Sequence, residues 1–227
     1  MKKLLLIFGV FLFSIGNIIA QDVDFNRVRL GIFVMPAPSV VIAQNTAIET
    51  GGGIGFGGGI IADYAFSERY WLGTGIGITN LPASTTVVDL TNFTTTADYN
   101  IRYLEIPLTL KLLTGEIGTG SAGYFKYFGQ AGVNLAVPLS ARYDRTSTDP
   151  LLILEENVKA NKQIQKINLG LIISAGTEYN IADQTSLYAA LWYNAGFTGV
   201  LKSVQGLNDS DDKVTLGYVG IKVGAMF

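Results

Sequence analysis

Seven charged side chains of this chain occur singly, each inside a stretch of otherwise apolar or glycine-rich sequence. Buried charges of this kind are stable when they pair with one another or line a polar path. Two kinds of chemistry are therefore open to them. One is an internal network of salt bridges and hydrogen bonds, and the other is a narrow path for an ion or a small solute. The seven residues are Arg29, Asp63, Glu105, Lys111, Lys126, Glu178 and Lys222.

The sequence contains no histidine and no cysteine. Enzymes that activate a serine or a water molecule mostly use histidine as the base, and transition-metal sites are built largely from histidine and cysteine. A Ser-Lys or carboxylate mechanism stays open, but no serine in the apolar stretches stands beside a lysine or carboxylate in a distinctive way. We therefore expect no enzymatic activity, no catalytic residue, no metal and no cofactor.

Two further motifs resemble binding sites. The run Gly51–Gly59 contains Gly-x-Gly-x-x-Gly spacings, but a phosphate cradle requires a following helix, and a two-residue alternation follows instead. We interpret these glycines as structural. The acidic segment Asp209–Asp212 lacks the glycine and distal glutamate of a calcium-binding loop. We interpret it as a solvated loop tip, with weak divalent-ion bridging to lipopolysaccharide as the alternative.

The last fifteen residues, Lys213–Phe227, indicate which elements carry the charges. One parity of this segment is almost wholly apolar, whereas the other mixes glycines with Tyr218 and Lys222. Alternate residues of a strand face opposite sides. A membrane barrel strand turns its apolar face to lipid and its polar face to the lumen. A mid-strand lysine and a final aromatic residue, Phe227, favour such a strand, and Phe227 resembles the C-terminal aromatic read by the barrel-insertion machinery.

The same alternation recurs seven more times. Short and long connections alternate along the chain, which is typical of outer-membrane barrels, and an even strand number places both termini on the short-turn side. Pro36–Pro38 is expected to end the first strand, and Pro107 to cause a bulge or local break. The expected strands are about Arg27–Met35, Gly53–Phe66, Tyr70–Thr79, Tyr99–Leu112, Tyr124–Leu139, Lys166–Tyr179 and Leu187–Phe197. The expected long loops are about Ala37–Gly52, Leu81–Asp98, Ser140–Gln165 and Thr198–Asp212.

The first twenty residues are typical of a secretory signal peptide. Lys2 and Lys3 precede an apolar run, and small residues lead to Ala20. The run is short for a transmembrane helix, although a retained anchor is the alternative. We expect residues 1–20 to be a cleaved signal and residues 21–227 to be one domain.

Composition supports a barrel. Hydrophobic residues make up 48% of the chain and charged residues 15%, with 27 glycines. High apolar content without long apolar runs is what alternation produces. A soluble sandwich or lipocalin-like barrel is the alternative, but it would expose bare rows such as Gly73, Gly75 and Gly77, which inside a narrow barrel make room for bulky neighbours. The fold class that we expect is all-β: a single up-and-down antiparallel transmembrane barrel of eight strands, or ten if a long loop hides a hairpin.

The segment Tyr103-Leu104-Glu105-Ile106-Pro107 resembles the Y-L-E-[IV]-P segment of PorT-like outer-membrane β-barrel proteins of Gram-negative bacteria. The leader, the glycine-rich strands and Phe227 are similar as well, so that the resemblance covers the mature chain. It implies a small barrel in the outer membrane, and it implies little about the role of that barrel.

Two functional hypotheses follow. The first is a structural or interaction component of the cell envelope, with a lumen filled by the charge network, acting through outer loops or periplasmic turns. The threonine-rich segment Thr85–Thr96 favours this hypothesis. The second is a narrow passive pore or small-ligand barrel, favoured by Gln130, Asn134, Asn168 and Asn194. The expected partners are outer-membrane lipid and lipopolysaccharide, the barrel-insertion machinery and an envelope protein. With 16 basic and 18 acidic residues, nothing points to nucleic acid.

Overall fold

A computed structural model describes residues 27–43, 48–88, 93–118, 123–148, 154–160, 164–182, 185–200 and 214–227. The expected signal peptide and the acidic segment Asp209–Asp212 lie outside these ranges. Within them, no helix is long and apolar enough to cross a membrane. The strands are β1 (Val28–Ala43), β2 (Ile48–Gly52), β3 (Ile54–Ala65), β4 (Tyr70–Val88), β5 (Thr94–Leu113), β6 (Tyr124–Ser147), β7 (Glu155–Lys159), β8 (Asn168–Ala182), β9 (Thr185–Gly196) and β10 (Val214–Met226).

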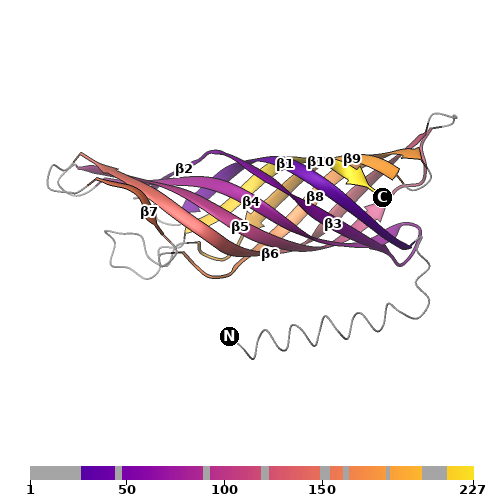
Figure 1. The fold of residues 1–227 in the computed structure, drawn as a ribbon, viewed down its shortest axis with the longest axis horizontal. Coiled ribbons are helices and arrows are strands. Elements are labelled where there is room, and N and C mark those ends of the chain that lie inside the picture. Colours follow the sequence, from indigo (N-terminus) through magenta and orange to yellow (C-terminus); the bar gives the residue numbers. More distant parts are fainter. Residues whose placement is uncertain are drawn as a thin grey trace, which may run out of the picture.

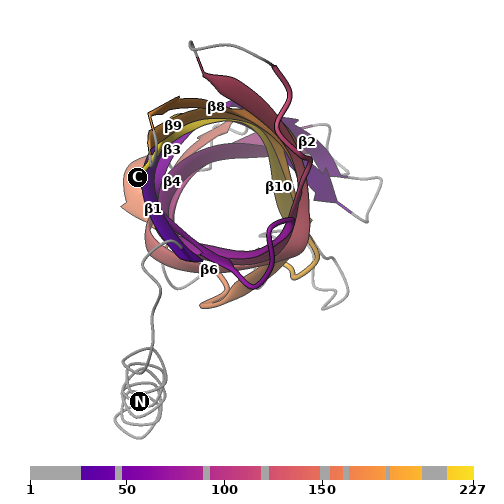
Figure 2. The ribbon, with the colours of Figure 1, turned by 90° about the vertical axis from the view of Figure 1, so that its right-hand side faces the viewer.

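Eight of these strands form a closed antiparallel barrel, which confirms the predicted fold class. Around the wall the order is β1, β3, β4, β5, β6, β8, β9 and β10. The first and last strands close the ring, with Gly31 opposite Met226 and Ala43 opposite Val214. Figure 2 shows the ring along its axis, and Figure 1 shows that β1 begins and β10 ends at the same end of the barrel.

The two remaining strands do not add to the wall. β2 continues β3 along the same neighbour, because both pair with β4 and the register shifts by one residue at Gly53 between them. The hydroxyl of Ser39 fills this irregularity, accepting a hydrogen bond from the amide of Gly53 at 3.0 Å. β7 pairs with the outer end of β6, in the connection that was expected to be a long loop. The hidden hairpin therefore exists without a ten-stranded wall.

The strands extend well beyond the predicted ends, so the expected long loops were partly wrong. β4 reaches Val88 and β5 begins at Thr94, so that most of Leu81–Asp98 is a hairpin. β1, β2 and β6 likewise occupy parts of the loops expected at 37–52 and 140–165. In Figure 1 these extensions project from the end opposite the start of β1 and the end of β10. The reason is that the two-residue alternation continues past the membrane-facing part, although its apolar parity changes.

Pro36 and Pro38 do not end β1, contrary to the prediction. They have the same parity, so the backbone positions that lack an N–H point toward the same neighbour. On that side, pairing with β10 is absent between Val34 and Ser39. On the other side, pairing with β3 runs through both prolines without interruption. The strand continues because one of its two ladders is intact.

Pro107 causes a local break, as predicted. Pairing between β5 and β4 is missing between Leu108 and Glu105, and the register on either side is unchanged. The bulge between β5 and β6 lies elsewhere. It belongs to β6, whose extra residue Leu139 lies opposite the step from Arg102 to Tyr103 of β5. Because a bulge shifts the parity of the bulged strand, it alters which β6 residues face outward above it.

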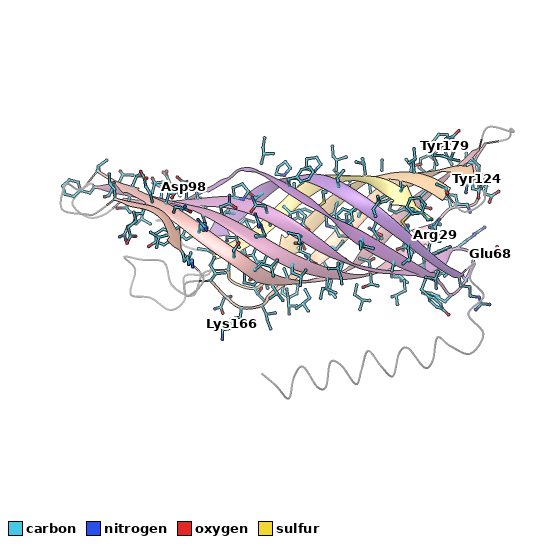
Figure 3. The ribbon with its side chains drawn as sticks, viewed as in Figure 1. Arg29, Glu68, Asp98, Tyr124, Lys166 and Tyr179 are labelled. Carbon is cyan, nitrogen blue, oxygen red and sulfur yellow. The ribbon has the colours of Figure 1, made fainter. Side chains whose placement is uncertain are left out.

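In the half of the barrel where β1 begins and β10 ends, the apolar residues of the alternating pattern face outward. Ile32, Ile60, Ile76 and Ile221 are each more than half exposed, as a lipid-facing surface requires. Aromatic residues lie at the strand ends on this side, among them Tyr179, whose ring centroid is 4.6 Å from that of Phe125. Figure 3 shows Tyr124 and Tyr179 at this end of the barrel. Further exposed aromatic residues, of the kind that form the interfacial girdle of membrane barrels, are Tyr64, Phe66, Tyr70, Tyr127 and Phe227.

Glycines inside the barrel make room for large side chains, as expected from their rows. A Cβ at Gly77 would lie 3.1 Å from the ring of Phe33, and one at Gly176 would lie 2.7 Å from the ring of Phe128. Beyond this half, the inward parity itself becomes apolar. Met35, Leu81 and Ile101 are at most 3% exposed and belong to one buried cluster inside the extended strands.

We expect Gly224→Val to destabilise the barrel by about 1–3 kcal/mol, because overpacking forces backbone and side-chain shifts. A Cβ at Gly224 would lie 2.1 Å from the carbonyl oxygen of Ile32 and 2.7 Å from the Tyr188 ring. Urea unfolding followed by fluorescence of the two tryptophans measures the change. Gly115→Val is the control, since no atom lies within 4 Å of its Cβ position; equal stability of the two variants would contradict the packing argument.

Candidate functional site

Four charged residues from four strands meet across the lumen near the end where β1 begins and β10 ends. They are Arg29 of β1, Asp63 of β3, Lys111 of β5 and Glu178 of β8, and we call them the ionic layer. β1 and β8 are not neighbours in the wall, and neither are β5 and β8. The two ion pairs of Glu178 therefore join strands that are not neighbours in the wall.

Glu178 is the centre of this layer. Arg29 donates to both carboxylate oxygens, to Oε2 at 2.9 Å and to Oε1 at 3.2 Å. Lys111 Nζ lies 2.5 Å from the same Oε1. Lys111 also bonds to Asp63 at 2.8 Å, and Arg29 lies 3.9 Å from the same Asp63 oxygen. Two cations and two carboxylates balance in charge. A two-pronged guanidinium–carboxylate contact adds geometric specificity to the pairing.

Aromatic rings cover the two cations of the ionic layer. The guanidinium of Arg29 lies 4.3 Å from the ring centroid of Trp71, and Lys111 Nζ lies 4.5 Å from that of Phe128. Cation–π contacts are strongest when the cation is removed from water, and Lys111 is 4% exposed. Charge pairing and aromatic bulk thus fill this section of the lumen together.

Glu105 forms a second layer farther from the termini, which we call the carboxylate layer. It accepts hydrogen bonds from the hydroxyl of Thr79 at 2.8 Å, the amide of Asn134 at 3.0 Å and the hydroxyl of Tyr218 at 2.8 Å. β5 and β10 lie on opposite sides of the ring, so the Tyr218 bond spans the lumen. Among the described residues, Glu105 has no ion pair within 4 Å, and neutral donors satisfy it instead.

Lys222 lies between aromatic rings rather than beside a carboxylate. Its Nζ is 3.2 Å from the ring centroid of Trp192 and 4.2 Å from that of Phe33. It is 5% exposed, and no ion pair of it occurs in the described part of the chain. Lys126 is in a different position. It lies at the lumen mouth and pairs at 3.4 Å with Glu116, which is 57% exposed.

The structure therefore brings four of the seven predicted charges into direct contact and leaves three apart. Without Lys126 at the mouth, three basic and three acidic side chains remain inside. Two of the four polar residues that favoured a pore contribute to internal bonds: Asn134 binds Glu105, and Asn168 donates to the hydroxyl of Tyr103 at 3.3 Å. The residues that sequence reasoning did not assign are Thr79 and Tyr218; inward parity was their only signal.

The third section is apolar and reaches the outer mouth. Met35, Tyr103 and Leu216 lie within the buried cluster described above. Residues from the connections complete it: Ala160 and Val200 are at most 5% exposed. The amide of Ala160 donates to the carbonyl of Ala141, and that of Val200 to the carbonyl of Val214. These contacts cover the lumen at the end that carries the hairpins.

Small cavities remain between the layers. One of about 40 Å³ is lined by Glu105, Lys111, Lys222 and Pro107 among others, and a second of about 20 Å³ lies beside Tyr103 and Asn168. Each holds at most a few water molecules. In the described ranges, no group of three or more carboxylates is placed to hold a metal ion.

Comparison with known proteins identifies a family. The model of the outer membrane protein β-barrel domain matches residues 13–212. No sequence among the curated proteins matches. Similar solved structures include OprG from Pseudomonas aeruginosa, with 18% identity, a TM-score of 0.49, and coverage of 88% of this chain and 94% of that one. Neisserial surface protein A has 15% identity, a TM-score of 0.43, and coverage of 88% and 97%. Ail of Yersinia pestis has 12% identity, a TM-score of 0.33, and coverage of 88% and 99%.

We expect Glu178→Gln to destabilise the barrel by about 3–5 kcal/mol, because it leaves Lys111 and Arg29 with Asp63 as their one carboxylate partner in the ionic layer. Glu116→Gln is the matched control. It removes one carboxylate from an exposed pair, so we expect a change of at most about 1 kcal/mol. Urea unfolding in detergent measures both. A Glu178 variant no less stable than the Glu116 variant would show that the ionic layer does not hold the walls together.

We expect Glu105→Gln to lower stability by about 1–3 kcal/mol, because one of the two acceptor oxygens becomes a donor. The new NH₂ group would face either the Asn134 amide or the hydroxyls of Thr79 and Tyr218. Thermal unfolding, followed by the loss of the folded band on unheated gels, measures the change. Thr79→Val/Glu105→Gln, which removes one donor, is expected to recover part of the loss. An unchanged melting temperature for Glu105→Gln would argue against a hydrogen-bonded carboxylate layer.

Proposed function

Because this chain belongs to the outer membrane protein β-barrel domain family and lies in the outer membrane, we propose that its barrel is a filled anchor. In this proposal the protein is a structural or interaction component of the cell envelope. It acts through the outer hairpins or the periplasmic turns, and not by passing solutes through the lumen.

The filling of the lumen is the observation that carries the proposal. The ionic layer, the carboxylate layer and the apolar cluster follow one another along the axis, and each joins strands that are not neighbours in the wall. The cavities between them are about 40 and 20 Å³. An eight-stranded barrel has an interior just wide enough for its own side chains, so this filling leaves no room for a solute.

The outer hairpins offer the contact surface. β4, β5 and β6 project beyond the barrel, as Figure 1 shows on the side away from the termini. Hydroxyl groups connect them: the Thr86 and Thr96 side chains lie 3.1 Å apart, and those of Thr95 and Ser147 lie 3.0 Å apart. A hairpin held in this way is preorganised, which lowers the entropy cost of binding a partner.

Further parts of the proposal rest on the sequence. We propose a PorT-like barrel, since Tyr103 and Glu105 of the resembling segment both serve inside the lumen. Residues 1–20 are proposed as the cleaved signal peptide of a protein exported by a Gram-negative bacterium, and residues 21–227 as the mature domain. Phe227 is proposed as the contact of the insertion machinery. The absence of histidine and cysteine supports a non-enzymatic role.

A narrow pore or small-ligand barrel is the second candidate. The cavity of about 40 Å³ supports it, because this cavity reaches the wall where Pro107 breaks the ladder. Among the described residues, Asn134 Oδ1 and the hydroxyl of Tyr188 are buried without a hydrogen-bond partner, and both residues line that cavity. A small polar molecule would satisfy these groups.

Single-channel recording in a planar bilayer separates the two candidates. We expect the folded protein to be silent, because three layers of side chains block the axis. Heat-modifiable migration on a gel first confirms that the inserted protein is folded. Tyr103→Ala/Tyr218→Ala removes two rings from the lumen and serves as the matched variant.

Openings in this variant alone would locate the barrier at these rings and support the filled anchor. Stable, reproducible openings of the unmodified protein would contradict the filled anchor and favour the pore.

A further inference from the structure

A polar groove of about 450 Å³ lies on the outer surface of the wall, where β4, β5 and β6 extend beyond the barrel. Its lining includes Asn80 of β4, Asn100 and Arg102 of β5, and Arg142 of β6. Asp98, at the far end of the groove, is labelled in Figure 3 near the outer end of the wall. The groove is separate from the lumen, since Asn100, Arg102 and Arg142 are exposed on the face opposite to buried Ile101 and Tyr143.

The groove begins where the lipid-facing surface ends. On β5 the outward residues from Leu112 to Leu104 are apolar, and the next one is Arg102. On β4 the outward residue Ile78 is followed by Asn80. In outer-membrane barrels the longer connections lie outside the cell. Arg102 is therefore at the level of the outer-leaflet headgroups, directly above the acyl chains.

The two arginines of the groove have no acidic partner among the described residues: neither Arg102 nor Arg142 has an ion pair within 4 Å there. Arg142 donates one hydrogen bond, at 2.6 Å, to the side-chain oxygen of Asn157. Its direct partner on β7 is Lys159, and like charges in directly opposite positions destabilise a sheet. Three cations thus share one exposed face, where an anion would relieve their repulsion.

The acidic residues lie farther from the membrane. Asp98 and Asp144 are direct cross-strand partners, and Asp144 Oδ1 accepts the backbone N–H of Asn157. Along β5 the order away from the membrane is basic, then amide, then acidic, in Arg102, Asn100 and Asp98. On β6, Arg142 lies opposite Asn100, and Asp144 follows it opposite Asp98. This order matches a ligand with its negative charge at the membrane and hydroxyl groups beyond it, because carboxylates and amides accept hydrogen bonds from hydroxyls.

We propose that this groove binds the phosphorylated sugar headgroup of an outer-leaflet glycolipid. The guanidinium groups of Arg102 and Arg142 bind a phosphate, for which their planar fork is well suited. Asn80, Asn100 and Asp98 bind sugar hydroxyls. The site gives the envelope component proposed above a lipid partner, and it depends on the orientation of the barrel but not on whether the lumen conducts.

Titration of the purified, folded protein with diphosphoryl lipid A in detergent, followed by native mass spectrometry, tests the site. We expect Arg102→Gln/Arg142→Gln to weaken binding about tenfold or more, as two charge-assisted bonds are lost. Arg27→Gln/Arg69→Gln is the charge-matched control. Both of its residues are exposed at the opposite end of the barrel, and we expect its affinity to stay within about twofold of the unmodified protein. Gel migration confirms that both variants fold.

Two ligand controls define what is recognised. Dephosphorylated lipid A is expected to bind about as weakly to the unmodified protein as lipid A binds to the groove variant. Inorganic phosphate at millimolar concentration is expected not to displace lipid A. Equal binding of the dephosphorylated lipid, or displacement by phosphate alone, would overturn the proposal.

Metal-bridged binding is tested separately. EDTA and Asp98→Asn/Asp144→Asn are expected to leave the affinity for lipid A within about threefold. Loss of binding in both would show that a divalent cation held by the two aspartates recognises the lipid, and would overturn the role of the arginines. An equal loss of lipid A affinity in the groove variant and in the charge-matched control would show that net charge alone determines binding. That result would also overturn the site.

Discussion

The carboxylate of Glu178 is the point on which the inner half of the barrel depends. It is 2% exposed and receives both Arg29 and Lys111, from strands on other sides of the ring. A buried carboxylate without such partners would be strongly unfavourable. In turn, the two cations are tolerable in the lumen only because Glu178 and Asp63 are there. The rest of the inner half accommodates these ion pairs. The glycine rows admit the side chains, and aromatic rings cover the cations.

The two halves of the barrel solve the same problem in different ways. In the membrane, the outside must be apolar, so the inside carries the polar residues and binds them to one another. Beyond the membrane, the outside is polar and the inside is an ordinary hydrophobic core, with Met35 and Ile101 each 1% exposed. The protein therefore changes from a membrane barrel to a water-soluble one along the same strands. The hairpins gain the rigidity of a packed core at the place where they meet the surroundings.

The sequence predicted the features that depend on local alternation, and less of those that depend on closure. The inward parity of Lys111, Glu105 and Glu178 follows from the period of two alone. Which of them touch one another depends on the stagger between strands, so the Tyr218–Glu105 bond, across 113 residues, had no local signal. The end of β4 was placed too early and the start of β5 too late. The apolar parity changes at Leu81, and this change resembles a loop when only a lipid-facing pattern is sought.

The seam between β1 and β10 joins the first and last strands of the barrel. If strand pairing begins with neighbouring hairpins, this seam forms last. Its ladder is interrupted between Val34 and Ser39. There the thioether of Met35 packs over Gly220, with a Cβ position only 2.7 Å from its sulfur. β1 and β10 are thus paired over two separate stretches and not along their whole length. Amide protons of β10 between these stretches lack β1 acceptors, so this strip of the wall should exchange with solvent deuterium first.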